Sequence, residues 1–91
     1  MHYVEKIPNG KLVAIDFELS NGKVSSMKIT GDFFLHPEES IEIIEGTFLG
    51  VSKDISDAEL LVRLNRAVQK MELIGVSVDD LVRMFKKAVK K

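Results

Sequence analysis

The candidate functional side chains of this sequence gather in residues 30–37, which hold an aspartate, two adjacent phenylalanines and a histidine. Asp32 offers a carboxylate that can cap a backbone N–H at a turn or hold a residue of another protein. Exposed aromatic side chains such as Phe33 or Phe34 commonly anchor protein interfaces. These residue types therefore favour a role in binding a partner protein. The candidate docking residues are Gly31, Asp32, Phe33, Phe34 and His36.

Other kinds of chemistry have little support in the sequence. The chain has no cysteine, which excludes thiol nucleophiles, thiolate metal sites, disulfides and persulfide carriage together. His2 and His36 share no metal-ligand spacing with each other or with a carboxylate, so we interpret both as ordinary surface or turn residues. The six glycines are dispersed and make no phosphate-binding loop. We expect no catalytic residue, no metal site, and no cofactor bound by this chain alone.

Size and charge exclude further classes. Ninety-one residues make one domain, residues 1–91, with room for a single core but not for a deep substrate cavity as well. Thirteen basic and fourteen acidic residues leave the net charge near zero, which argues against nucleic acid as a partner. No apolar run approaches the roughly 18 residues of a membrane span, and the N-terminus is too polar for a signal peptide. We expect a cytoplasmic protein without membrane association.

The first third of the chain follows the period of β-strands. Three segments fit strands joined by short turns: residues 3–7, 11–19 and 23–30. The predicted turns are residues 8–10, which end in Asn-Gly, and the Asn-Gly pair at residues 21–22, because both residue types tolerate positive φ. Met27 and Ile29 share one face of the third strand. The inward set of the second strand is Val13, Ile15, Phe17 and Leu19. We predict a three-stranded antiparallel meander.

The rest of the chain follows the period of helices. Three helices are expected, starting after Pro37, Ser56 and Ser77, and glycines 50 and 75 should end the first two. Their apolar stripes are Ile41, Ile44 and Phe48; Leu60, Leu61, Leu64, Ala67, Val68 and Met71; and Leu81, Met84, Phe85 and Ala88. Strands followed by helices predict a two-layer α+β domain, with the helices packed on one face of the sheet.

Residues 30–37 join the predicted sheet to the predicted helices. Gly31 permits a backbone conformation that other residues avoid. In a strand, Phe33 and Phe34 point to opposite faces, so only one of them can easily enter the domain's own core. The other needs a second surface, which we expect a partner to supply.

Two charged helix faces allow a structural and a functional interpretation. Solvated acidic residues early in a helix and basic residues late in a helix complement the helix dipole. Alternatively, the basic end could approach a partner's acidic surface, or the phosphates of a nucleotide that the partner holds. The acidic residues are Glu38, Glu39, Glu42 and Glu45. The weaker docking candidates at the basic end are Lys86, Lys87 and Lys90.

The run Ile-Thr-Gly-Asp-Phe-Phe-Leu-His-Pro-Glu-Glu-Ser-Ile at residues 29–41 resembles the signature of the small accessory domain of lipoate-protein ligases. A hairpin with a Gly-Lys pair precedes it and a helix follows it, so the likeness covers roughly residues 10–85. In that family the domain is either fused behind the catalytic domain or made as a separate small subunit. Because the chain starts at Met1, we expect the separate form, in a heterodimer with a large subunit.

The resemblance implies an accessory role in a two-part lipoate-protein ligase. The large subunit would bind ATP, Mg and lipoate, form lipoyl-adenylate, and transfer the lipoyl group to a lysine of an acceptor domain. The small subunit is associated with the activation step. The fold is also similar to the iron-sulfur scaffold (SufE/NifU-like) fold, so a non-catalytic adaptor in sulfur transfer or iron-sulfur assembly stays open as the alternative. A regulatory module with a small apolar pocket between sheet and helices is a third interpretation.

Overall fold

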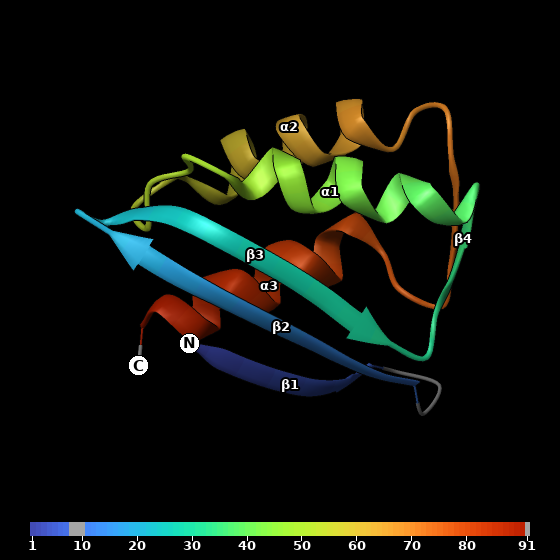
Figure 1. Cartoon of the computed structure of the whole chain (residues 1–91), viewed down its shortest axis with the longest axis horizontal. Coiled ribbons are helices and arrows are strands. Elements are labelled where there is room, and N and C mark those ends of the chain that lie inside the picture. Colours follow the sequence, from blue (N-terminus) through green and yellow to red (C-terminus); the bar gives the residue numbers. More distant parts are fainter. Residues whose placement is uncertain (8–10, 91) are drawn as a thin grey trace.

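The chain forms a three-stranded antiparallel sheet with helices over one of its faces (Figure 1). The computed structural model describes residues 1–7 and 11–90. The strands, in sheet order, are β1 (His2–Ile7), β2 (Lys11–Ser20) and β3 (Lys23–Gly31). The helices are α1 (Ile41–Phe48), α2 (Asp57–Ala67) and α3 (Val78–Val89). Helix α1 packs on β3, α3 packs on β1, and α2 packs on both other helices. The predicted α+β arrangement, a meander followed by helices, is confirmed.

The alternation along β2 decides which face of the sheet is buried. Val13, Ile15 and Phe17 are almost completely buried beneath the helices, and Leu19 is partly buried and packs against the core. Asp16 and Glu18 point to the other face and are exposed. The predicted inward set of this strand is therefore confirmed, and the opposite sheet face is left to solvent, as is common for antiparallel sheets.

The predicted turn between β2 and β3 is also confirmed. Asn21 and Gly22 have φ values of 53° and 77°, which a two-residue hairpin turn of this kind requires. The turn predicted at residues 8–10 lies outside the described residues.

The helix starts follow their capping residues. The Ser56 hydroxyl accepts a hydrogen bond from the Glu59 N–H at 3.1 Å at the start of α2. Ser77 and Asp80 form a capping box at the start of α3, with both reciprocal bonds present. Before α1, the segment η1 (Glu38–Ser40) forms a short 3-10 turn, so the first predicted helix begins as a tighter turn and continues as an α-helix.

The predicted course of the second helix is wrong beyond Ala67. We expected Val68 and Met71 on its apolar stripe, but α2 ends at Ala67. The following segment instead forms strand β5 (Glu72–Ile74), which pairs antiparallel with β4 (Phe34–His36) in a two-stranded ribbon. Val68 and Met71 still pack against the core from the turn that follows α2. Their apolar surface is thus buried without a longer helix, and tertiary pairing outweighs the helical period.

The core is centred on Phe85 of α3. The centroid of its ring lies 5.4 Å from that of Phe17 on β2 and 5.4 Å from that of Phe48 on α1. Tilted aromatic pairs at this spacing add to the stabilisation that comes from burial alone. The three rings hold the sheet, α1 and α3 in one fixed arrangement, from which the β4–β5 ribbon extends.

A charged cluster connects the edge strand β1 to α3. The Glu5 carboxylate accepts a hydrogen bond from Arg83 Nε at 2.9 Å and lies 3.4 Å from Lys87 Nζ. Arg83 also donates to Asp80 Oδ1 at 2.9 Å. Burial by itself raises the pKa of Glu5, but hydrogen bonds and the positive charge of Arg83 outweigh it and lower the pKa. For Asp80, burial is likewise outweighed, by hydrogen bonds from Ser77 and Arg83, and the pKa is lowered.

We expect this cluster to make the fold sensitive to acid. A carboxylate whose pKa is lower in the folded state stabilises the fold above its unfolded pKa, and this contribution is lost as the pH falls through the folded pKa. Glu5 and Asp80 start from ordinary values of 4.5 and 3.8, so the loss should fall below pH 4.5. Urea midpoints measured across this range should decrease for the wild type and decrease less for Arg83→Met. An Arg83→Met variant with the same acid dependence as the wild type would contradict this assignment.

Candidate docking surface

The outer face of the β4–β5 ribbon carries the most exposed large apolar side chain among the described residues. Phe34 and Ile74 lie directly opposite each other in the ribbon, and their exposed fractions are 68% and 49%. The adjacent pair, Leu35 and Leu73, points to the other face and packs in or against the core. The ribbon therefore presents an apolar cross-strand pair to solvent. Figure 1 shows β4 at one end of the molecule.

A histidine and a glutamate continue this outer face. His36 and Glu72 are the next pair on the same side of the ribbon, and both are exposed. Apolar centres with polar surroundings are typical of protein interfaces. We call these four residues the ribbon face: Phe34, His36, Glu72 and Ile74.

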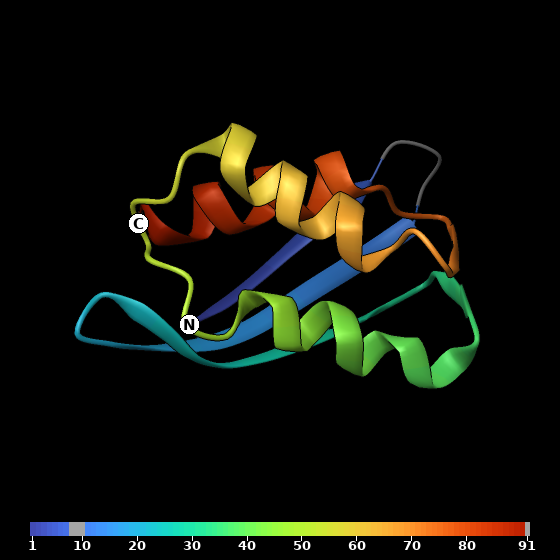
Figure 2. The ribbon, with the colours of Figure 1, turned by 90° about the horizontal axis from the view of Figure 1, so that it is seen from above.

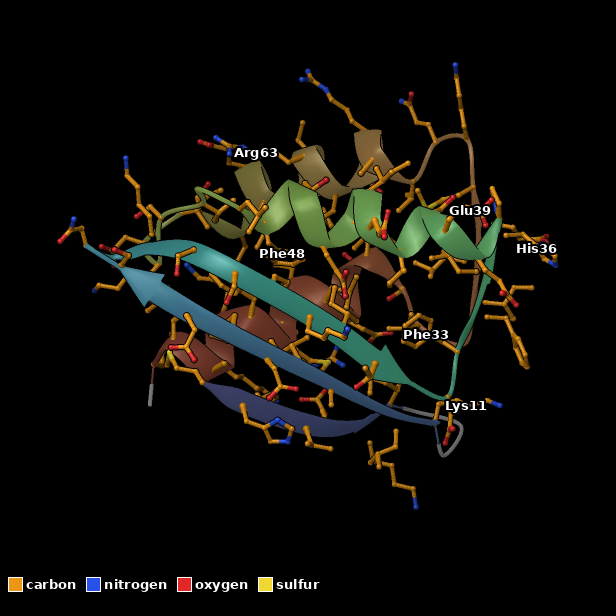
Figure 3. All side chains as sticks on the ribbon, in the orientation of Figure 1. Lys11, Phe33, His36, Glu39, Phe48 and Arg63 are labelled. Carbon is orange, nitrogen blue, oxygen red and sulfur yellow. The ribbon has the colours of Figure 1, made fainter. Side chains whose placement is uncertain are left out.

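An open cavity of about 230 Å³ lies beside the ribbon face. Its apolar lining includes Phe33, Leu35 and Ile41, and its polar lining is His36 and Glu38. Figure 3 shows Phe33 and His36 at the end of the molecule where the chain passes from the sheet to the first helix. A cavity of this kind next to an exposed aromatic residue can receive an apolar side chain of a partner.

Gly31 and Asp32 determine how the chain leaves β3 for the ribbon. Gly31 has a φ of 149°, and a Cβ at this position would lie 2.4 Å from the Leu12 carbonyl oxygen. The Asp32 N–H donates to that same carbonyl at 2.8 Å. The Asp32 carboxylate is exposed, and neither a hydrogen bond nor an ion pair joins it to another described residue. The Asp32 side chain therefore caps no backbone N–H among the residues that the structure describes.

The predicted division between the two phenylalanines is confirmed. Phe33 is partly buried and packs against the core, whereas Phe34 points to solvent. Their adjacent positions in an extended segment send them to opposite sides, as expected from the strand period. The expectation that the exposed ring docks on a partner stays a prediction.

The weaker docking candidates lie elsewhere. Lys86, Lys87 and Lys90 are at the C-terminal end of α3, at the opposite end of the molecule from β4 (Figure 1). Lys86 Nζ donates to the Ile55 carbonyl and lies 3.9 Å from the Asp57 carboxylate. The structure does not bring these lysines together with the ribbon face.

One residue of the acidic helix face has a structural contact. Glu45 Oε2 accepts a hydrogen bond from the Ile29 N–H at 2.7 Å. Ile29 belongs to β3, which is an edge strand of the sheet, and its N–H lies on the outer edge of that strand. The interpretation of this face as merely solvated is therefore wrong for Glu45, which closes part of the open sheet edge.

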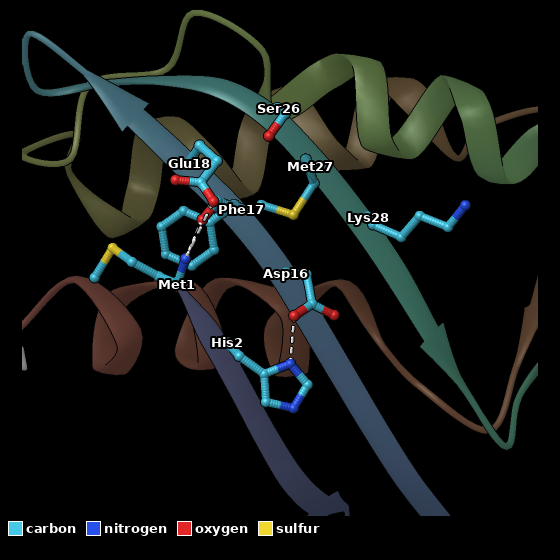
Figure 4. Close-up of a pocket in the computed structure, with 8 residues that line it drawn as sticks. All are labelled: Met1, His2, Asp16, Phe17, Glu18, Ser26, Met27 and Lys28. Carbon is cyan, nitrogen blue, oxygen red and sulfur yellow. Dashed lines mark hydrogen bonds and ion pairs between the residues drawn. The ribbon is translucent and has the colours of Figure 1, made fainter.

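A second cavity, of about 360 Å³, has a serine, a histidine and an aspartate in its lining (Figure 4). His2 Nδ1 pairs with Asp16 Oδ1, as in a catalytic triad. Ser26 is on β3, however, and β2 separates it from His2 on β1. The usual strand spacing places the two strands about 10 Å apart. Ser26 therefore cannot pass a proton to His2, and the three residues make no nucleophilic site.

Neither a membrane span nor a metal site is found in residues 1–7 and 11–90. No helix there combines the length and apolar character needed to cross a membrane. No group of three or more histidine, aspartate or glutamate side chains there is placed to hold a metal ion.

The β5 half of the ribbon face is not evident from the sequence. The helical period predicts Glu72 and Ile74 at the end of a helix, whereas the structure places them opposite His36 and Phe34. The signal that could have found them is the short run Glu-Leu-Ile before Gly75, whose φ is 98°. Such a run before a turn glycine fits a short strand as well as a helix end.

The structure is that of a small α+β domain whose ribbon face exposes apolar surface to solvent. Its sequence matches the family described as bacterial lipoate protein ligase C-terminus over residues 1–85. This match covers nearly the whole chain, and the chain belongs to that family.

The fold is similar to that of a solved archaeal protein. The structure concerns an archaeal lipoylation system, described as a bi-partite lipoate protein ligase and its E2 lipoyl domain from Thermoplasma acidophilum. The matched chain is 22% identical with a TM-score of 0.71, and the match covers 93% of this chain and 97% of that chain. At this identity the likeness shows a shared fold. Comparison with curated proteins gives no significant match.

Proposed function

We propose that the chain is the accessory subunit of a two-part lipoate-protein ligase. In a cytoplasmic heterodimer with a large catalytic subunit, it supports the ATP-dependent activation of lipoate to lipoyl-adenylate, which precedes the lipoylation of lysines on acceptor domains. Membership of the lipoate protein ligase C-terminus family and the structural likeness to a chain from a bi-partite archaeal system support this proposal.

The large subunit supplies the chemistry in this proposal. It binds ATP, Mg and lipoate, and the small chain binds none of them alone. The dispersed glycines and the lack of cysteine in the small chain agree with that division. The alternative of an adaptor in sulfur transfer or iron-sulfur assembly has no observation of its own in the structure.

A separate lid domain suits the two steps of the reaction. Activation produces a mixed anhydride that water destroys, and it requires the carboxylate and the α-phosphate to be held in line. A domain that closes over the cleft excludes water and restricts the reacting groups. Transfer of the lipoyl group must then admit a bulky acceptor protein, so the lid domain has to move away again. A small subunit held by a limited interface can meet both requirements.

The observation that carries the proposal is the exposed apolar pair of the ribbon face. Phe34 and Ile74 stand in solvent beside a cavity with apolar lining. Burying such surface against another protein is favourable by roughly 25 cal/mol per Å². We assign docking of the large subunit to the ribbon face, with Asp32 at its rim. Gly31 and Phe33 hold the ribbon in position from behind.

A lipoate-dependent ATP–pyrophosphate exchange assay tests the proposed function. The large subunit alone, this chain alone and their mixture are compared under the same conditions. We expect exchange in the mixture and little or none in either component. A large subunit that is equally active without this chain would remove the accessory role in activation.

A further inference from the structure

The turn between β2 and β3 presents an asparagine followed by a glycine to solvent. Asn21 is exposed, and a Cβ built on Gly22 would have one atom of the described residues within 4 Å, the Lys53 Cε at 3.8 Å. The tip of this hairpin lies at the end of the molecule opposite β4 (Figure 1). Figure 2 shows that the tip extends beyond the ends of the helices. The Asn21 side chain is therefore open to water and lies away from the ribbon face.

An exposed Asn-Gly pair can undergo an intramolecular reaction that needs no enzyme. Once a solvent base has taken the proton of the Gly22 N–H, this nitrogen attacks the Asn21 Cγ. The new N–Cγ bond closes a five-membered imide ring, and the side-chain amide nitrogen leaves as ammonia. Water then opens the ring at either carbonyl carbon, which yields aspartate or isoaspartate. The reacting atoms belong to adjacent residues, so the reaction gains from their proximity.

Local structure favours this reaction at Asn21 over Asn65, the other asparagine that the structure describes. Gly22 has no side chain to obstruct the attack, and glycine adopts at low cost the backbone rotations that ring closure requires. The tip of a hairpin also opens more readily than the interior of a packed element. Asn65 lies in α2, where the helix fixes the backbone, and Arg66 follows it with a long side chain. We therefore expect ring closure at Asn21 and not at Asn65.

We propose that Asn21 is a site of spontaneous deamidation at which isoaspartate accumulates. The site lies outside the proposed docking surface, and the inference does not depend on the proposed function. In isoaspartate the backbone runs through the side-chain carbons Cβ and Cγ, so the turn gains one backbone atom. The former backbone carbonyl becomes a free carboxylate, which adds a negative charge to the tip of the hairpin.

The additional backbone atom should weaken the attachment of the hairpin to the segment between α1 and α2. The Gly22 carbonyl accepts a hydrogen bond from the Lys53 N–H at 2.8 Å, and Lys23 forms an isolated antiparallel bridge with Ser52. Both contacts depend on the two-residue turn that closes the Ser20–Lys23 pair. Aspartate keeps the length of this turn, and Asp-Gly suits the same turn type. Isoaspartate should therefore destabilise the fold, and aspartate should not.

Peptide mapping by mass spectrometry, during incubation at mildly alkaline pH, tests the site. Asn21 should be converted to aspartate and isoaspartate at least about tenfold faster than Asn65, which is the control within the chain. The pair Asn9-Gly10 lies outside the described residues and is followed in a separate peptide. Asn21→Gln prevents closure of the five-membered ring and should leave this peptide unchanged. If Asn21 stays intact as long as Asn65 does, the turn protects its asparagine and the inference is wrong.

Thermal unfolding tests the structural consequence. The isoaspartate form is separated by chromatography from the unreacted protein in an Asn9→Gln background, and Asn21→Asp is the matched variant with the same added charge. The isoaspartate form should unfold at a lower temperature than Asn21→Asp, which should unfold at the temperature of the unreacted protein. Equal unfolding temperatures for all three would overturn the expected destabilisation. Neither measurement uses the large subunit, so the outcome is independent of the proposed function.

Discussion

Replacing Phe34 by alanine is expected to weaken binding of the large subunit about tenfold to a hundredfold. Phe34 is 68% exposed in the free chain, so the substitution removes contact surface without opening a cavity in the core. Aromatic anchors at the centre of an interface cost roughly 2 kcal/mol or more when truncated. Titration calorimetry should show the weaker binding. The exchange assay, run at limiting concentrations of this chain, should lose activity in the same proportion.

Two further variants define the specificity of that result. Ile74→Ala should act in the same direction, and the double variant should lose less than the sum of the two, because the side chains are opposed neighbours. Leu49→Ala is the matched control, since Leu49 is 53% exposed but follows α1, away from the ribbon. If Phe34→Ala and Ile74→Ala both leave complex formation and pyrophosphate exchange unchanged, the ribbon face is not the docking surface.

The sheet could be predicted because its signals are local. Strict alternation in β2 and the Asn-Gly pair after it determine the pairing of neighbouring strands without information from the rest of the chain. The helix starts are local in the same way, since Ser77 and Asp80 act within a single turn. These signals were sufficient for the order of strands and helices and for the buried faces.

The ribbon could not be predicted, because its two strands, β4 and β5, lie far apart in the sequence. Each strand has three residues, too few for a periodic pattern to distinguish a strand from a helix end. Only the packed core brings Phe34 opposite Ile74. The same reason applies to the approach of Lys86 to Asp57, which depends on how α2 and α3 pack. The likeness to the iron-sulfur scaffold fold stays a prediction.

The partition of the two phenylalanines shows how far a local argument extends toward the site. Adjacent residues of an extended segment must face opposite sides, so one ring in the core implies one ring in solvent. The sequence did not determine which ring was which. The structure decides it, because Leu35 follows Phe34 and is buried against the core on the same side of the ribbon as Phe33.

Gly31→Ala is expected to destabilise the fold by about 2–4 kcal/mol, which makes it the most damaging single methyl addition that we identify. The φ of 149° is one that residues with a side chain rarely adopt. The new Cβ would lie 2.4 Å from the Leu12 carbonyl oxygen and 2.8 Å from the Val13 Cα. Both atoms belong to the backbone of β2, so no side-chain rotation can relieve the overlap.

Relief of this overlap requires the end of β3 to move away from β2. That movement would stretch the bond from the Asp32 N–H to the Leu12 carbonyl and displace the ribbon that follows. Urea unfolding should therefore show a lower midpoint, and binding of the large subunit should weaken in the fraction that remains folded. Gly46→Ala is the matched control: this glycine lies within α1 with no atom within 4 Å of an added Cβ, and the substitution should stabilise the fold by up to about 1 kcal/mol. Equal midpoints for Gly31→Ala and the wild type would mean that the approach of β2 to Gly31 does not constrain the ribbon.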